Sequence, residues 1–175
     1  MMMKNLGRVT KEKDGYKVRL ERSLPYPIDT VWSAITDTKK MSQWFTDVKM
    51  DFVPGGKMMI RFRDEANTES FGKIVRIDPP HVFEYMWEDE LATWELFPEG
   101  DQKCTLVLTY SKLPETYALS APAGWHVLLD QLEEVLGGAS GPYPFGGPES
   151  ESTKKIKQLY ADIVGKQFPE LKSTI

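Results

Sequence analysis

The sequence predicts an α+β fold in which one antiparallel sheet packs against a long helix. Three observations predict it. First, a segment in which apolar and polar residues alternate is followed by two short amphipathic segments. Second, five or six further segments of the same alternation are separated by turn residues. Third, after Pro114 the apolar residues recur at helical spacing. Strands that follow one another through short turns pair as an antiparallel sheet. A sheet with one apolar face needs a cover, and the long helix has enough apolar surface to provide it.

Composition and charge narrow the class of protein. The chain has 175 residues, of which 41% are hydrophobic and 27% charged. This size predicts one domain that hides roughly 70% of the surface of the unfolded chain. The net charge of −4 argues against nucleic-acid binding, which normally uses a basic face, and no apolar run approaches the roughly 18 residues of a membrane span. The lone Cys104 and an N-terminus without a signal-peptide pattern predict a cytoplasmic protein.

The first predicted strand follows a charged N-terminal segment. Residues 1–14 show no pattern and are expected to be a flexible lead-in. From Tyr16 to Leu20 apolar and charged residues alternate, which is typical of a half-buried strand. Pro25 and Pro27 end this strand because proline cannot donate to a ladder.

Two short helices are expected after this strand. Apolar residues at i, i+3, i+4 and i+7, counted from Ile28, predict the first helix. Asp37 can cap the second helix, which carries Trp44 and Phe45 on one side.

Alternating segments with turn residues between them predict the rest of the sheet. The expected strands are Asp47–Phe52, Lys57–Arg63, Phe71–Ile77, His81–Trp87, Thr93–Phe97 and Lys103–Tyr110. The segment Glu88–Leu91 is expected to be a hairpin loop. Its acidic residues, including Asp89 and Glu90, are therefore expected to be solvated charges rather than catalytic groups.

A long helix and a C-terminal extension complete the chain. Apolar residues from Trp125 to Leu136 recur at helical spacing and predict the long helix. The predicted domain covers residues 15–138. Residues 139–149 are rich in glycine and proline and are expected to be a linker. Residues 150–170 are expected to be a helical extension packed on the same domain.

This order of elements resembles the helix-grip fold of the START-like, birch-pollen-allergen-like superfamily (SRPBCC). It resembles most closely the bacterial-type relatives of the C-terminal domain of the heat-shock-protein-90 ATPase activator. The matching segments are residues 27–37, 43–45, 54–57, 72–80 and 124–132. The resemblance implies a curved sheet wrapped around the long helix, two short helices after the first strand, an extra C-terminal helix, and an apolar cavity between sheet and long helix.

The same resemblance, together with 11% aromatic residues, predicts that the cavity binds a small hydrophobic ligand, aromatic or lipid-like, in a carrier or sensor. Polar groups on Tyr85, Tyr110 and His126 would orient the ligand. The alternative for each residue is a place in a solid core. The candidate ligand-binding residues are Trp44, Met58, Ile60, Phe62, Phe83, Tyr85, Trp87, Trp94, Leu106, Leu108, Tyr110, Trp125, His126 and Leu129.

Two other functions stay open at this point. The family implies a protein-interaction module that regulates a chaperone ATPase in the stress response. The cavity could also serve a cyclase or hydrolase with His126 as acid or base, although no second catalytic group accompanies it. We therefore assign no catalytic residue and no cofactor. Two histidines and one cysteine, scattered along the chain, predict no metal site, and both a monomer and a homodimer fit the sequence.

Overall fold

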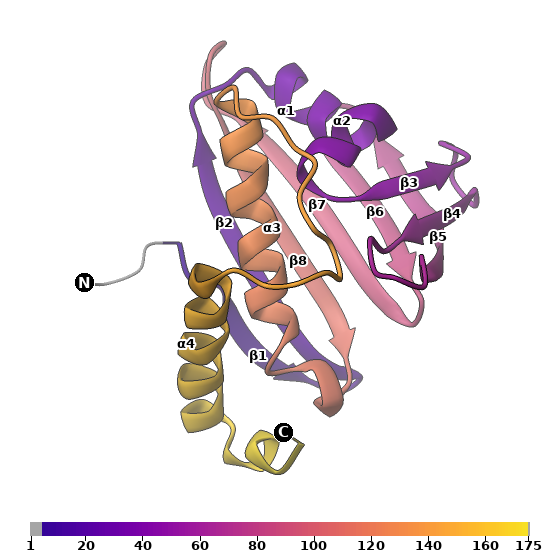
Figure 1. Cartoon of the computed structure of the whole chain (residues 1–175). Coiled ribbons are helices and arrows are strands. Elements are labelled where there is room, and N and C mark those ends of the chain that lie inside the picture. The colour runs from indigo at the N-terminus through magenta and orange to yellow at the C-terminus, as the bar shows by residue number, and fades with distance from the viewer. Residues whose placement is uncertain (1–4, 175) are drawn as a thin grey trace.

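The computed structural model describes residues 5–174, with side chains described up to Leu171, and shows one sheet of eight strands with helices against it (Figure 1). Every neighbouring pair of strands is antiparallel, and their order is β1-β2-β8-β7-β6-β5-β4-β3. The strands are β1 Arg8–Glu12, β2 Gly15–Leu24, β3 Asp47–Met50, β4 Lys57–Arg61, β5 Glu69–Asp78, β6 Val82–Trp87, β7 Glu90–Pro98 and β8 Cys104–Leu113. The α+β prediction is confirmed.

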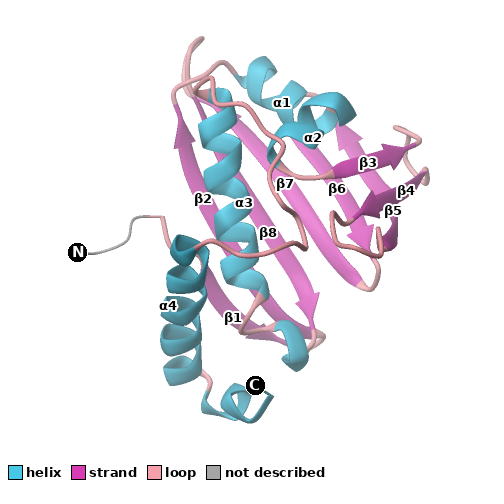
Figure 2. Ribbon diagram, in the orientation of Figure 1, coloured by secondary structure: helices cyan, strands magenta, loops and turns pink. Residues whose placement is uncertain are grey.

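The helices α1 Ile28–Thr36, α2 Thr38–Trp44 and α3 Ala121–Leu136 cover one face of this sheet (Figure 2). The core lies between them and the sheet, where alternate residues of β2 and β8 are buried. The long helix α3 buries a wide stripe that includes Trp125, Leu129 and Leu132. This is the cover that an antiparallel sheet with one apolar face requires.

The two short helices begin where the sequence predicts. Pro27 stands at the N-cap of α1, and the side chain of Asp37 accepts hydrogen bonds from the backbone N–H groups of Lys39 and Lys40 at the start of α2. These bonds satisfy two donors that a helix leaves free at its first turn. The indole of Trp44, at the end of α2, donates to the carbonyl of Ala34, at 2.8 Å, and so ties the two helices together.

The N-terminal segment differs from the prediction. Residues 8–12, expected to belong to a flexible lead-in, form the edge strand β1, which pairs with residues 15–19 of β2. Only Val9 of this strand is buried, so no alternation of apolar residues marks it in the sequence. The part of the predicted lead-in before residue 5 lies outside the described residues.

The segment 139–149, expected to be a linker, runs across the helical side of the molecule and contacts the domain closely (Figure 1). Arg63, just after β4, donates from its backbone N–H to the carbonyl of Phe145 at 2.7 Å and from its guanidinium to the carbonyl of Tyr143 at 2.7 Å. The backbone at Gly141 lies so close to Gln43 that an added Cβ would stand 2.0 Å from its carbonyl oxygen. Glycine is required there because of this close approach.

The last helix, α4 Glu151–Gln167, packs against α3 and is followed by the 3₁₀ segment η2 Pro169–Thr174. Its buried residues Ile156, Tyr160 and Val164 join the core. None of the helices in residues 5–174 combines the length and hydrophobicity needed to span a bilayer.

Candidate functional site

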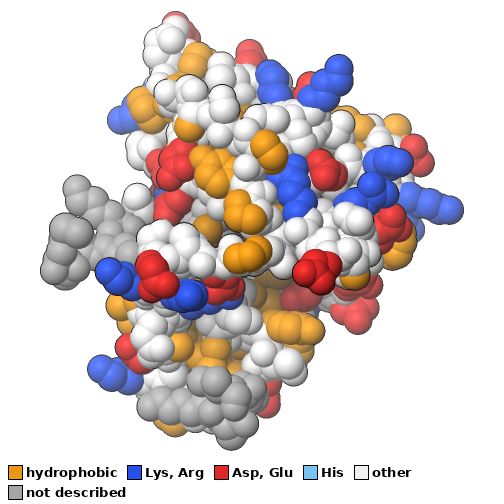
Figure 3. All heavy atoms as spheres, viewed as in Figure 1, with side chains coloured by type: hydrophobic (Ala, Val, Ile, Leu, Met, Phe, Trp, Pro, Cys, Tyr) orange, Lys and Arg blue, Asp and Glu red, His pale blue; other side chains and the backbone are white. Residues whose placement is uncertain are grey.

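A hollow of about 600 Å³ opens beside the N-terminal half of α3. Six aromatic side chains line it, namely Phe62, Trp87, Tyr110, Tyr117, Trp125 and Phe145. We call this hollow the aromatic cleft. Figure 3 shows hydrophobic side chains gathered in a recess over the lower part of α3, with acidic side chains beside it.

The rings of the aromatic cleft contact one another around Trp125. The centroid of the Trp125 ring lies 4.9 Å from that of Tyr110 and 5.9 Å from that of Trp87. The centroid of the Phe145 ring lies 4.8 Å from that of Phe62, and both rings also contact Trp87. All of these pairs are edge-on or tilted, an arrangement that aromatic rings prefer over face-to-face stacking. The walls are therefore held rigidly by the core. Trp87, Phe62 and Phe145 are partly buried, whereas Tyr110 and Trp125 are only 3% and 4% exposed.

The helical wall is open because of a glycine. Ala121, Gly124 and Leu128 lie one and two turns apart on α3 and face the cleft together with Trp125. A Cβ added at Gly124 would meet no atom within 4 Å. The space above this residue therefore belongs to the cleft and not to a packed interface.

The rim of the cleft carries the turn between β6 and β7. The residues of this turn and its edge, Glu88, Asp89 and Glu90, all line the cleft. The carboxylate of Glu88 accepts hydrogen bonds from the backbone N–H of Phe71, at 2.9 Å, and from the hydroxyl of Ser70, at 2.8 Å. These bonds hold the turn, in which Glu88 adopts a left-handed φ of 53°.

Glu90 differs from the loop residue that the sequence predicts. It is the first residue of β7, pairs with Trp87, and is partly buried, with its carboxyl beside the Tyr110 hydroxyl. Burial and the neighbouring charge of Asp89 raise the pKa of Glu90 above its usual value, and the Tyr110 hydroxyl opposes this change. Burial, and then the charge of Glu90, raise the pKa of Tyr110, which therefore keeps its proton. The expectation that Glu90 is a solvated loop charge is wrong.

The opposite side of the rim is formed by α4 and by the 3₁₀ turn η1 Glu115–Tyr117. Lys157 of α4 lines the cleft, and its ammonium is paired with the carboxylate of Glu149. Tyr117 contributes a ring that is about half exposed. A second, smaller hollow of about 400 Å³ between η1 and α4 shares Lys157 but has no aromatic ring among its described lining residues.

The structure divides the fourteen candidate residues into three groups. Phe62, Trp87, Tyr110 and Trp125 line the aromatic cleft. Nine others lie in the closed core with at most 2% of their surface exposed, namely Trp44, Met58, Ile60, Phe83, Tyr85, Trp94, Leu106, Leu108 and Leu129. Burial raises the pKa of Tyr85, whose hydroxyl accepts from the Trp94 indole at 3.4 Å. His126 forms the third group.

His126 faces α4 and is not among the residues that line the cleft. Its Nδ1 lies 2.8 Å from the hydroxyl of Tyr160, and its Nε2 lies 3.5 Å from a carboxylate oxygen of Asp130. The guanidinium of Arg22 donates to Asp130 at 2.7 Å, and the hydroxyl of Tyr160 accepts from the backbone N–H of Gly7, also at 2.7 Å. Burial, with a contribution from the charge of Arg22, lowers the pKa of His126, and Asp130 acts in the opposite direction.

A neutral imidazole fits these contacts. When Nε2–H donates to Asp130, Nδ1 is the acceptor for the Tyr160 hydroxyl. This network joins β2, α3, α4 and the segment before β1, so His126 has a structural role here. In the described part of the chain, no group of three or more His, Cys, Asp or Glu side chains is arranged to hold a metal ion.

Sequence reasoning missed three features of the cleft. Phe145 stands in a segment with no apolar periodicity, and Gly124 is a single glycine within a helical pattern. Glu90 follows directly on a turn, which favours the expectation of a solvated charge. In the structure Trp87 pairs with Glu90 across a two-residue turn. Two-residue turns are the commonest hairpin connections, so assuming one here would have placed Glu90 in the strand.

The fold and cleft define the class of this protein: a START-like helix-grip domain, in which an antiparallel sheet wraps a long helix and two short helices follow the long strand β2. The model of the family described as "Activator of Hsp90 ATPase homolog 1-like protein" matches residues 25–137. The chain belongs to this family. None of the curated proteins matches the sequence.

Solved structures share the fold at low sequence identity. CalU16 from Micromonospora echinospora is 22% identical, with a TM-score of 0.71, over 92% of this chain and 96% of that chain. EF2215 from Enterococcus faecalis, a conserved protein of unknown function, is 19% identical, with a TM-score of 0.74, over 91% of both chains. The protein encoded by BPP1335 from Bordetella parapertussis is 24% identical, with a TM-score of 0.65, over 91% of this chain and 94% of that chain. At these identities the likeness concerns the fold alone.

Proposed function

We propose that this protein binds a small, largely apolar ligand in the aromatic cleft, as a carrier or sensor. One observation carries the proposal: an open hollow of about 600 Å³ is lined by six aromatic rings. Small-molecule sites typically measure about 300–1,000 Å³ and combine apolar walls with a few polar groups. Glu90, Tyr110 and Ser70 supply such polar groups at the rim.

Burial of the ligand supplies the binding energy. A ligand that buries about 300 Å² of apolar surface gains about 7.5 kcal/mol at ~25 cal/mol per Å². Association and the ordering of side chains consume part of this gain. A ligand with two or three fused rings, or a comparable acyl chain, fits this requirement. The rigid aromatic walls reduce the cost of ordering the site.

A thermal-unfolding screen against fatty acids, flavonoid-like aromatics, polyketides and sterols tests the proposal. A ligand at 100 times its Kd adds about 2.7 kcal/mol to the free energy of unfolding, which for this size raises Tm by about 5–10 °C. The Gly124→Leu variant should lose the shift, because its side chain occupies the cleft. A shift that persists in this variant would contradict the proposal by placing the ligand outside the aromatic cleft. No shift with any class would also contradict it and would favour a protein-interaction role.

A further inference from the structure

The charges around the aromatic cleft are unbalanced. Three carboxylates line it, Glu88, Asp89 and Glu90, whereas Lys157 is the one basic residue among the described residues that line it. Lys157 is already paired with Glu149 of the segment before α4. The charged residues that line the cleft therefore carry a net negative charge.

The three carboxylates have different surroundings. Glu88 is occupied by the N–H of Phe71 and the hydroxyl of Ser70, and Asp89 is exposed to solvent. Glu90 is partly buried between these charges and the ring of Tyr110. It is the carboxylate that a ligand inside the cleft can reach, while the other two add to the net negative charge.

We propose that the aromatic cleft selects ligands that carry a positively charged amine on an apolar or aromatic body. The ammonium would lie between the Glu90 carboxylate and the partly buried ring of Trp87, which pairs with Glu90 across the turn. This inference rests on the proposed function of the same cleft and names the chemical class of its ligand.

Two physical effects support a cation. The face of an aromatic ring attracts a positive charge, with indole the strongest of the side chains, and this attraction grows when the cation leaves water. A cation also relieves the repulsion among the three carboxylates, which a neutral ligand leaves in place. An anionic ligand is repelled, because its charge would lie beside Glu90. The ammonium of Lys157 does not offset this repulsion, since it is already paired with Glu149.

Three naphthalene compounds of matched shape separate charge from shape. They are 2-(1-naphthyl)ethylamine, a cation at pH 7; 2-(1-naphthyl)ethanol, which is neutral; and 1-naphthylacetate, an anion. Isothermal titration of the full chain at low salt should give the amine at least tenfold tighter binding than the alcohol, and the carboxylate the weakest. The amine's advantage should shrink as salt is added, because ions screen exposed charges.

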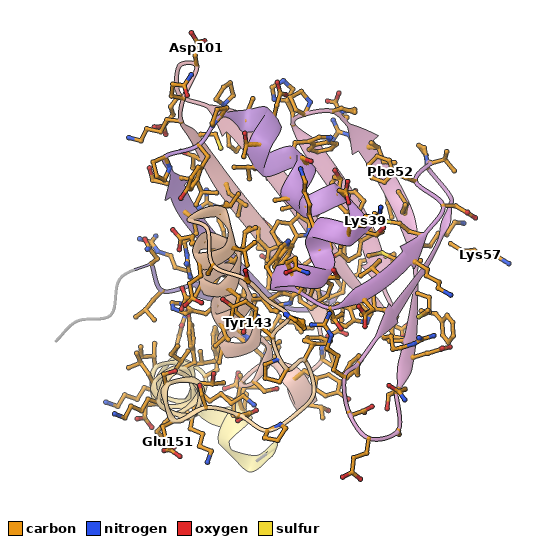
Figure 4. The ribbon with its side chains drawn as sticks, turned by 45° about the horizontal axis from the view of Figure 1, so that its top comes forward. Lys39, Phe52, Lys57, Asp101, Tyr143 and Glu151 are labelled. Carbon is orange, nitrogen blue, oxygen red and sulfur yellow. The ribbon has the colours of Figure 1, made fainter. Side chains whose placement is uncertain are left out.

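Variants assign the effect to one residue. Glu90→Gln keeps the shape of the side chain and should reduce the preference for the amine over the alcohol by at least fivefold. Asp101→Asn is the matched control, because it also removes one carboxylate but lies at the far tip of the β7–β8 hairpin (Figure 4). It should leave the preference unchanged.

The outcomes are distinguishable. Equal binding of the three compounds, or a preference for the carboxylate, would overturn the amine selectivity while the cleft remained a binding site. Loss of the preference in Asp101→Asn as well would show that net charge, and not Glu90, is responsible, and would also overturn it. Failure of all three compounds, together with failure of the ligand screen, would overturn both the selectivity and the proposed function.

Discussion

Replacing Gly124 by alanine and by leucine tests whether the aromatic cleft is a binding site, because the structure separates the effects of these changes on binding and on stability. Gly124 lies in the first turns of α3, and a Cβ there would meet no atom within 4 Å. Alanine is favoured over glycine in a helix by about 1 kcal/mol. For a chain of this length, this gain raises Tm by about 2–4 °C. The unliganded alanine variant should therefore be more stable than the natural chain.

The leucine variant should keep its stability but lose affinity. Its side chain fills the space of about four ligand carbon atoms, and at about 0.8 kcal/mol per buried methylene the lost binding energy is about 3 kcal/mol. This corresponds to an increase in Kd of about two orders of magnitude. Calorimetric titration measures Kd, and thermal unfolding without ligand measures stability. Unchanged affinity in Gly124→Leu would place the ligand elsewhere, and a large loss of stability in both variants would show that the position is packed rather than open.

Three further predictions concern neighbouring groups. Trp125→Ala should lower the free energy of unfolding by about 3–5 kcal/mol in denaturant titrations, because this ring is 4% exposed and packed among other aromatic side chains; a cost below 1 kcal/mol would refute this packing. Glu90→Gln should raise Tm at pH 7 without ligand, since a carboxyl whose pKa is raised on folding destabilises the folded state where it is charged, and a lower Tm would contradict the unfavourable position of its charge. Because the pKa of His126 is lowered from its usual 6.5, the unfolded chain takes up a proton that the folded chain resists, so His126 costs stability as pH falls below 6.5. The difference in Tm between the natural chain and His126→Gln, measured from pH 8 to 5.5, should therefore shrink toward low pH, and a constant difference would be inconsistent with a buried neutral imidazole.

The fold could be predicted because its signals are local. Alternation marks β2, whose even-numbered residues from Tyr16 to Leu24 are buried, and the spacing of apolar residues marks α3. Proline and Asp37 fix the starts of the short helices through backbone constraints that depend on a few neighbours. Each of these signals involves residues within one or two turns of one another, and tertiary contacts reinforce them.

The candidate site could be predicted only in part, because its residues meet through long-range packing. Trp87, Tyr110 and Trp125 lie on faces that alternation and helical spacing identify, but nothing in the sequence distinguishes them from Trp94, which is closed off in the core. Phe145 reaches the cleft because its segment is held to Arg63, whose backbone N–H and guanidinium donate to carbonyls of that segment. Such bonds leave no pattern in the sequence.

His126 illustrates the same limit. Its position beside Trp125 favours the prediction of a ligand-orienting group, but neighbouring residues of a helix point about 100° apart. Trp125 therefore faces the cleft while His126 faces Tyr160, which is 34 residues further along the chain. The direction of a single polar side chain depends on the partner that packs against it, and here the partner is a C-terminal helix whose docking side could not be read from its own pattern.

The division of α3 into two kinds of surface explains how one domain can be stable and still keep a cleft. Leu129 and Leu132, toward the C-terminal half of the helix, are almost fully buried, and Gln131 donates to the carbonyl of Trp44 at 2.8 Å, which fixes α3 against α2. At the N-terminal half, Gly124 presents no side chain to the cleft. The closed half supplies the packing that stabilises the domain, so the open half can tolerate unfilled space and a partly buried carboxylate. These two features each lower the stability of the free protein. A bound ligand would remove both effects by filling the space and by pairing with the carboxylate.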